Sequence, residues 1–153
     1  MRCSILIMVG LLFSGSASAQ TTNIAICGSS EGHGYYHHAG LVKKKDAGWV
    51  KEKISNGKTV LKHLGKNEFD ILVVDASGSI WSAKQDGSTV IPLRKTQSEI
   101  AILHITIKKV IEVYNFYKEK DGSLKFDLLQ NKSGDWLIPK SSVLTGSCSS
   151  INF

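Results

Sequence analysis

Three of the five histidines fall in the segment EGHGYYHH, which begins at Glu31. In an extended chain His33 and His37 would share one face with Tyr35, while His38 would point to the other face. Neutral imidazoles are common ligands of Zn²⁺ and Cu²⁺, so this face could form a metal site if Glu31 or a distant side chain completed it. The alternative is an exposed polar strand or loop that needs no metal.

A run of three lysines, Lys43, Lys44 and Lys45, precedes Trp49. Clustered lysines beside an aromatic side chain could contact an anionic polymer, lipid headgroups or an acidic protein. A solvated loop is the alternative. Recognition of nucleic acid requires several aromatics interleaved with basic residues, or a module signature, and the sequence has neither. We therefore expect no nucleic-acid partner but allow an anionic surface.

The stretch from Glu31 to Trp49 lacks a clear strand pattern and contains several glycines, which predicts a long irregular segment. Such segments on small β scaffolds are frequently functional. Tyr35, Tyr36, the three lysines and Trp49 are the candidate binding residues, since aromatic rings offer large contact areas at low entropic cost. In the alternative, Tyr35 and Tyr36 pair within an edge strand and Trp49 fills the end of a barrel.

Catalytic groups can be assembled only loosely. His104 with Asp70 or Asp75 could be drawn into a triad, but Ser77-Gly78-Ser79 lacks the Gly-x-Ser-x-Gly elbow. We expect His104 to be a hydrogen-bonded core or rim histidine and the two aspartates to bind turn amides. The sequence therefore predicts a protein that is not an enzyme and that uses no cofactor.

The first nineteen residues have the layout of a secretory signal peptide. Met1-Arg2 is a short positive region, Ile5 to Phe13 is apolar, and Ala17-Ser18-Ala19 offers small residues before a cleavage site. The apolar run is too short to span a bilayer. We expect a signal peptide over 1–19, a single domain over 20–153, no membrane span, and a periplasmic or secreted location.

Export leaves two cysteines, Cys27 and Cys148, near the two ends of the remaining chain. In an oxidising compartment such a pair usually forms a disulfide. The loop would hold over a hundred residues, and closing it would stabilise the fold by at most roughly 4 to 5 kcal/mol. We expect this bond to tie the first strand to the last and to secure the two edge elements of the sheet.

Composition and turn spacing indicate the fold class. The chain has 153 residues, room for one domain, with 42% hydrophobic residues and a net charge of +6. Turn dipeptides such as Asn56-Gly57 and Asp121-Gly122 recur about every ten residues between β-branched runs, as in a single antiparallel β-barrel or sandwich of about seven to nine short strands. The expected strands are 58–64, 69–76, 79–84, 89–94, 100–107, 110–117, 123–130 and 142–146. A helix over 99–117 is the alternative, because its apolar residues also match a helical stripe.

Two stretches together resemble small secreted proteins of unassigned function from Gram-negative bacteria. They are Ile26 to Tyr36, continuing to Gly40-Leu41 and Ala47 to Trp49, and Leu137 to Ser142 before Cys148. The resemblance implies a secreted, disulfide-closed domain and no particular activity. A second resemblance, to small periplasmic lysozyme inhibitors, is one of architecture, because these are exported β-barrels and many have one disulfide. Ala76 to Trp81 is similar to a Ser-Gly stretch of one such family, but the accompanying tyrosine and lysine pattern is not evident in this sequence.

Taken together, these features predict an exported binding or interaction domain whose partner is an unidentified protein or envelope component. Two alternatives remain open: a periplasmic metal-binding protein that uses His33, His37 and His38, and an inhibitor of a cell-wall enzyme.

Overall fold

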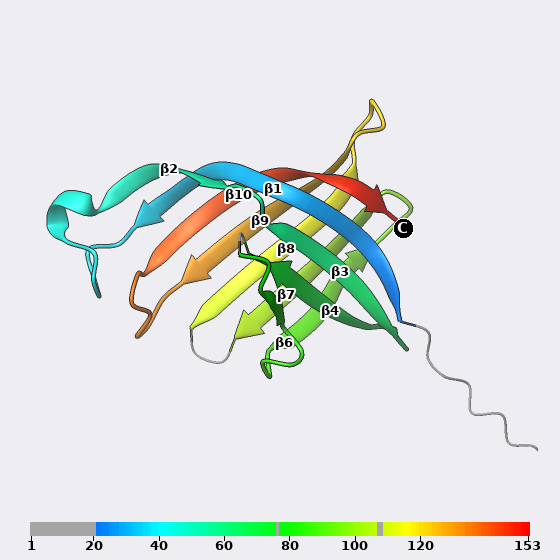
Figure 1. Ribbon diagram of the computed structural model, residues 1–153, viewed down its shortest axis with the longest axis horizontal. Helices are drawn as coiled ribbons and strands as arrows, with labels where there is room; N and C mark the ends of the chain where they lie inside the picture. Colours follow the sequence, from blue (N-terminus) through cyan, green and yellow to red (C-terminus); the bar gives the residue numbers. More distant parts are fainter. Residues whose placement is uncertain (1–20, 76, 107–108) are drawn as a thin grey trace, which may run out of the picture.

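The computed structural model describes residues 21–75, 77–106 and 109–153, which form one antiparallel sheet (Figure 1). A short 3-10 helix, η1 (Lys44–Asp46), is the only helical segment among these residues. The all-β antiparallel prediction is confirmed, with ten strands rather than seven to nine. They are β1 (Thr22–Tyr36), β2 (Gly48–Ile54), β3 (Lys58–Gly65), β4 (Glu68–Val74), β5 (Ile80–Ser82), β6 (Thr89–Lys95), β7 (Glu99–Thr106), β8 (Val110–Lys118), β9 (Leu124–Lys132) and β10 (Lys140–Ile151).

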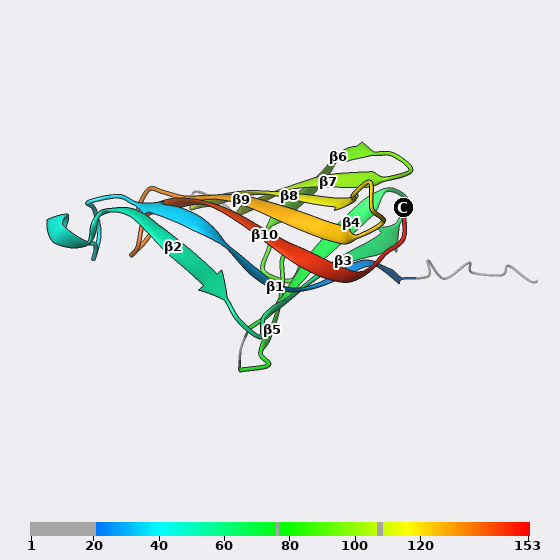
Figure 2. The ribbon, with the colours of Figure 1, turned by 90° about the horizontal axis from the view of Figure 1, so that it is seen from above.

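The sheet curls into a half-barrel. Its strand order is β5-β4-β3-β1-β10-β9-β8-β7-β6, and β2 pairs with β1 outside this path. Strand β1 is 15 residues long, and its first half pairs with β3 while its second half pairs with β2. Strands β3, β4 and β5 lie to one side of the layer formed by β6–β10 (Figure 2). The two ends of the sheet approach each other where β4 contacts β6.

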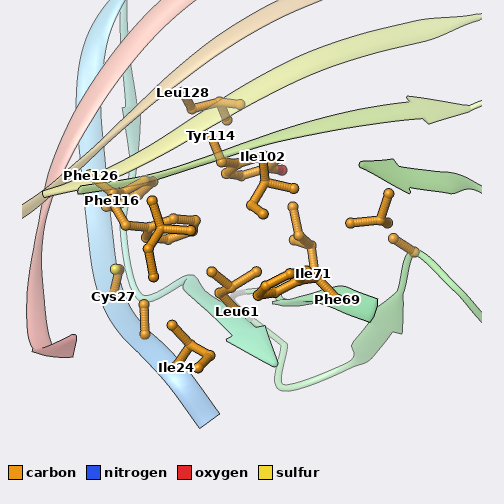
Figure 3. Close-up of a cluster of buried hydrophobic side chains, with 14 of the residues drawn as sticks. Ile24, Cys27, Leu61, Phe69, Ile71, Ile102, Tyr114, Phe116, Phe126 and Leu128 are labelled. Carbon is orange, nitrogen blue, oxygen red and sulfur yellow. The ribbon is translucent and has the colours of Figure 1, made fainter. Parts of the chain in front are cut away.

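The hydrophobic core fills one end of this half-barrel. Leu61 and Ile71 from β3 and β4 face Ile102, Phe116 and Phe126 from β7, β8 and β9 (Figure 3). Each of these five side chains is at most 1% exposed. Strict alternation places them on the concave face, because residues at i and i+2 of a strand point to the same side. The core therefore joins the two ends of the sheet from within.

The disulfide between Cys27 and Cys148 is present and joins register partners on β1 and β10. The expectation that it ties the first strand to the last is confirmed. The expectation that these are edge elements is wrong, because β1 and β10 are neighbours in the middle of the sheet. Cys27 is itself part of the core at 1% exposure, so the bond holds the centre of the sheet together.

The prediction of an irregular segment from Glu31 to Trp49 is wrong at both ends, since Glu31–Tyr36 belongs to β1 and Gly48 begins β2. Gly32 and Gly34, two of the glycines that suggested a loop, are instead in close contact with neighbouring strands of the sheet. A Cβ atom on Gly32 would lie 2.0 Å from the carbonyl oxygen of Val143 on β10. Glycine within a strand often marks such a close approach of backbone. Only 37–47 is irregular, apart from η1.

The segment 99–117, for which a helix was the alternative prediction, forms two strands. Glu99–Thr106 and Val110–Lys118 pair as β7 and β8, and the amide of Lys109 donates to the carbonyl of Thr106 at 3.2 Å in the turn between them. The β-branched side chains decided this local choice, as expected. The signal peptide over 1–19, Ala76, and residues 107–108 at the expected bend lie outside the described residues.

Substitution of Gly32 tests the close contact between β1 and β10. We expect Gly32→Ala to lower the free energy of unfolding by about 2 kcal/mol, because the two strands must separate to admit the methyl group. Gly28→Ala is the matched control, since a Cβ atom there would meet only the carbonyl oxygen of Ser147 at 3.9 Å. Urea denaturation measures both changes. Equal stability of the two variants would contradict the close contact.

Candidate functional site

A cavity of about 750 Å³ lies inside the half-barrel, next to the hydrophobic core. Its walls come from β3, β4 and β5 on one side and from β7, β8 and β9 on the other. Apolar lining is supplied by Val73, Ile80, Trp81, Leu128 and Trp136. The volume is in the range of pockets that enclose small molecules, which are mostly apolar with a few well-placed polar groups.

The concave face of β8 carries one carboxylate among apolar side chains. Val110, Glu112, Tyr114 and Phe116 alternate inward, and all four are buried. Glu112 is therefore placed inside the half-barrel by the same alternation that places the core. It lies at the boundary between the core and the cavity, which it helps to line.

Three donors surround the Glu112 carboxylate. His104 Nδ1 and the Tyr114 hydroxyl each donate to Oε2 at 2.8 Å, and the amide of Gln130 donates to Oε1. His104 comes from the position opposite Glu112 on β7, and Gln130 from the position opposite on β9. Burial alone would raise the pKa of Glu112, but the hydrogen bonds from His104, Gln130 and Tyr114 outweigh it and lower this pKa below its ordinary value of 4.5. The carboxylate is charged at neutral pH.

Three lysines line the cavity, and Lys132 is the most buried of them, since Lys53 and Lys58 are exposed. The side chain of Lys132 is half-buried at the end of β9, and its Nζ lies 5.3 Å from the centre of the Trp136 ring. Among the described residues it has no carboxylate within 4.0 Å. Burial and then the charge of Lys140 lower the pKa of Lys132 below its ordinary 10.5, against a smaller opposing effect of Glu112 and Glu52. The ammonium group thus lacks a close counter-ion in a partly dehydrated place.

A second polar cluster lies on the concave face of β1, β2 and β10. Glu52 accepts hydrogen bonds from the Tyr36 hydroxyl and from Lys140, with which it forms a partly buried ion pair. The hydrogen bond to Glu52, together with burial, raises the pKa of Tyr36 to about 12. The carboxyl of Glu52 lies over Gly34, where a Cβ atom would be 3.0 Å away. These bonds engage Lys140 in an ion pair, whereas the neighbouring Lys132 forms no ion pair among the described residues.

The candidate binding residues do not form one surface. Tyr35 and Trp49 are register partners on the convex face, with ring centroids 5.5 Å apart, while Tyr36 points to the concave face. Trp49 is 71% exposed, so it does not fill the end of the barrel. It borders a shallow convex groove with Val143. Strand alternation is the reason that adjacent tyrosines separate.

Lys43, Lys44 and Lys45 lie apart from both faces, exposed in and beside η1. The structure therefore divides the candidate residues among the convex face, the concave face and one loop.

The three clustered histidines are likewise only partly brought together. His33 and Tyr35 share the convex face of β1 as predicted, and His37 continues this side with its ring 5.2 Å from that of Tyr35. His38 lies in the following bend. Over 21–75, 77–106 and 109–153, no three His, Cys, Asp or Glu side chains are placed to hold a metal ion. A metal site at these histidines stays a prediction.

The residues considered for a triad have structural roles. Asp75 accepts from the amides of Ser77 and Ser79 at 2.8 and 3.0 Å, and Asp70 accepts from the amide of Lys84 at 3.0 Å. Both aspartates bind turn amides, as expected. His104 is 1% exposed and bonded to Glu112, which confirms the expected core histidine.

Sequence reasoning missed Glu112, Gln130 and Lys132. The signal was present, because Gln130 and Lys132 continue the inward positions of Phe126 and Leu128 along β9. A strand whose inward positions change from apolar to polar predicts a core that gives way to a cavity. Lys132 could not be assigned to the inward face from the sequence, because the expected strand ended at residue 130 and β9 continues to Lys132.

No family model, curated protein or solved structure matches this chain. The resemblance to small secreted Gram-negative proteins and the similarity to lysozyme inhibitors stay predictions. Within the described ranges, no helix is long and apolar enough to cross a bilayer.

Replacement of Glu112 tests the buried network. Near neutral pH, Glu112→Gln should lower the free energy of unfolding by about 1 to 3 kcal/mol, because buried donors lose a charged acceptor. Since the pKa of Glu112 is lowered by folding, its contribution is present above its ordinary value of 4.5 and is lost as pH falls through the folded-state value. The gap between wild type and variant should therefore shrink at lower pH.

Denaturation of both proteins near neutral pH and well below pH 4.5 measures this gap. Glu68→Gln is the control, since Glu68 is exposed and should show almost no difference at either pH. A gap for Glu112→Gln that stays constant across this pH range would show that the carboxylate contributes no charge-dependent stability.

Proposed function

We propose that this chain is an exported binding domain that holds a small amphipathic anion inside the half-barrel. The apolar body of the ligand lies along the cavity wall, and its acidic headgroup meets Lys132. Carboxylate, sulfate and phosphate headgroups share the chemistry that a lysine recognises.

The observation that carries the proposal is the state of Lys132. A half-buried ammonium group without a close counter-ion loses hydration and gains no ion pair in return. An anionic ligand would supply the missing partner and would restore the pKa of Lys132 toward its ordinary value. The neighbouring Lys140 adds positive potential, although its own ion pair with Glu52 keeps it engaged.

The rest of the cavity suits an apolar body. Trp81 and Ile80 from β5 face the cavity from one side, and Leu128 from β9 faces it from the other. Ile80 is 70% exposed and lines the cavity, so it offers apolar surface to the body of a ligand. Both oxygens of the Glu112 carboxylate accept hydrogen bonds, and these three donors reduce the repulsion between its charge and an anion.

Export is supported by the disulfide, because such bonds persist in oxidising compartments and are rare in the cytosol. A periplasmic or secreted location remains part of the proposal. It fits a domain that carries or captures an amphipathic molecule within the envelope.

Binding of dansyl-undecanoic acid, a fluorescent amphipathic carboxylate, tests the proposal. We expect saturable binding that raises dansyl fluorescence, and a loss of about 10- to 100-fold in affinity for Lys132→Ala, because a hydrogen bond to a charged group contributes about 1.5 to 3 kcal/mol. Lys125→Ala is the matched control, since Lys125 lies on the convex face of the same strand.

The methyl ester of the same probe separates charge from apolar contact. It should bind wild type and Lys132→Ala equally, because it carries no headgroup charge. If the acid binds both proteins with one affinity, or if neither form binds, the proposed role of Lys132 is wrong.

A further inference from the structure

Two loops form the end of the molecule opposite the C terminus (Figure 1). They are 37–47, which contains η1, and 133–139, which joins β9 to β10; together they are called the apical loops. The amide of His37 donates to the carbonyl of Pro139 at 3.1 Å, and the amide of Leu41 donates to the carbonyl of Leu137 at 2.8 Å. These hydrogen bonds fix the two loops to each other.

The apical loops hold large apolar side chains in the open. Leu41 and Leu137 are each 68% exposed, and Ile138 is 44% exposed. Val42 points inward and is buried, so it anchors its loop while Leu41 projects. Gly40 fixes this arrangement, since it has a φ of 59° and a Cβ atom there would lie 2.5 Å from the Leu137 carbonyl oxygen. The exposure is therefore built into the backbone.

The same end of the molecule is positively charged. Lys43, Lys44 and Lys45 are all exposed, and Asp46 is the only acidic residue of 37–47. In 133–139 the only acidic residue is Asp135, which lies 3.6 Å from the ammonium group of Lys109. A lysine cluster thus adjoins the exposed leucines with little opposing charge.

We propose that the apical loops dock on the surface of an anionic lipid bilayer. Exposed leucines on a protruding loop insert readily into the apolar region of a lipid bilayer, because lipids rearrange around them. A rigid protein partner would need pockets complementary to these side chains. Lysines beside them meet the negative headgroups. The exposed Trp49, two residues beyond 37–47, is of the type enriched at the level of the headgroups.

Docking would place the cavity near the membrane. Trp136 lines the cavity and is the neighbour of Leu137 in the same apical loop. An amphipathic anion leaving the bilayer would then have a short path to Lys132. The docking proposal rests on the loops alone and does not require the cavity to bind anything.

Flotation of the purified protein with phosphatidylcholine vesicles, with and without phosphatidylglycerol, tests the docking. We expect binding to the anionic vesicles, reduced about a hundredfold when Lys43, Lys44 and Lys45 are changed to Ser, because each lysine near such a surface contributes roughly fivefold. Leu41→Ser with Leu137→Ser should reduce binding at least tenfold.

The control changes Lys95, Lys118 and Lys120 to Ser, which removes the same charge from exposed positions at the opposite end of the sheet. This variant should lose at most a few-fold. A loss equal to that of the apical lysines would show that net charge alone drives binding and would overturn the proposal. Failure to bind anionic vesicles would overturn it too, as would capture of a protein by the apical loops without vesicle binding.

The two proposals fail separately. Lys132→Ala should leave vesicle binding unchanged, and the Leu41→Ser, Leu137→Ser variant should still bind dansyl-undecanoic acid in the absence of vesicles. That second result also shows that the apical variant is folded.

Discussion

The change of partner along β1 is the constraint on which the rest of the structure depends. One edge of this long strand pairs with β10, while the other edge pairs first with β3 and then with β2. Where β3 is the partner, the sheet curls back and closes over a packed core. Where β2 is the partner, the sheet stays open. The cavity lies between β3–β5 and β7–β9, next to the core, whereas the Glu52 cluster and the apical loops belong to the open part.

The pairing of β1 with β10 imposes its own demands on the sequence. Gly32 is needed because β10 approaches too closely for a side chain, and the disulfide fixes the same two strands at the core. The carboxyl of Glu52 fits over Gly34 for a similar reason. Positions that look flexible in the sequence are thus among the most constrained in the folded protein.

The charged side chains inside the half-barrel differ in how many hydrogen bonds and ion pairs they form. Glu112 is buried but accepts three hydrogen bonds, so its charge is stabilised within the protein. Glu52 and Lys140 form an ion pair with each other. Lys132 has the face of Trp136 and a repelling neighbour in Lys140, against which Glu112 and Glu52 exert a smaller effect. This asymmetry makes Lys132 the group that gains most from a bound anion.

The sequence predicted the antiparallel sheet and most strands from β3 onward, because turn dipeptides and alternation are local signals. It also predicted the disulfide, because Cys27 and Cys148 are the two cysteines outside the expected signal peptide. It failed to predict β1, because Gly32 and Gly34 of this strand are in close contact with strands that are distant in the sequence. It also grouped Tyr35 with Tyr36, which alternation places on opposite faces. Lys132 could not be chosen from among many lysines, since its surroundings include Trp136 and Lys140, which follow it across a turn.

A crystal structure of the protein with dansyl-undecanoic acid bound would test most directly whether the half-barrel holds an amphipathic anion. We expect the carboxylate within hydrogen-bonding distance of Lys132 Nζ and the chain inside the half-barrel beside Trp81. Density for the ligand only on the convex face or at the apical lysines, with the half-barrel holding none of it, would contradict the proposed binding site.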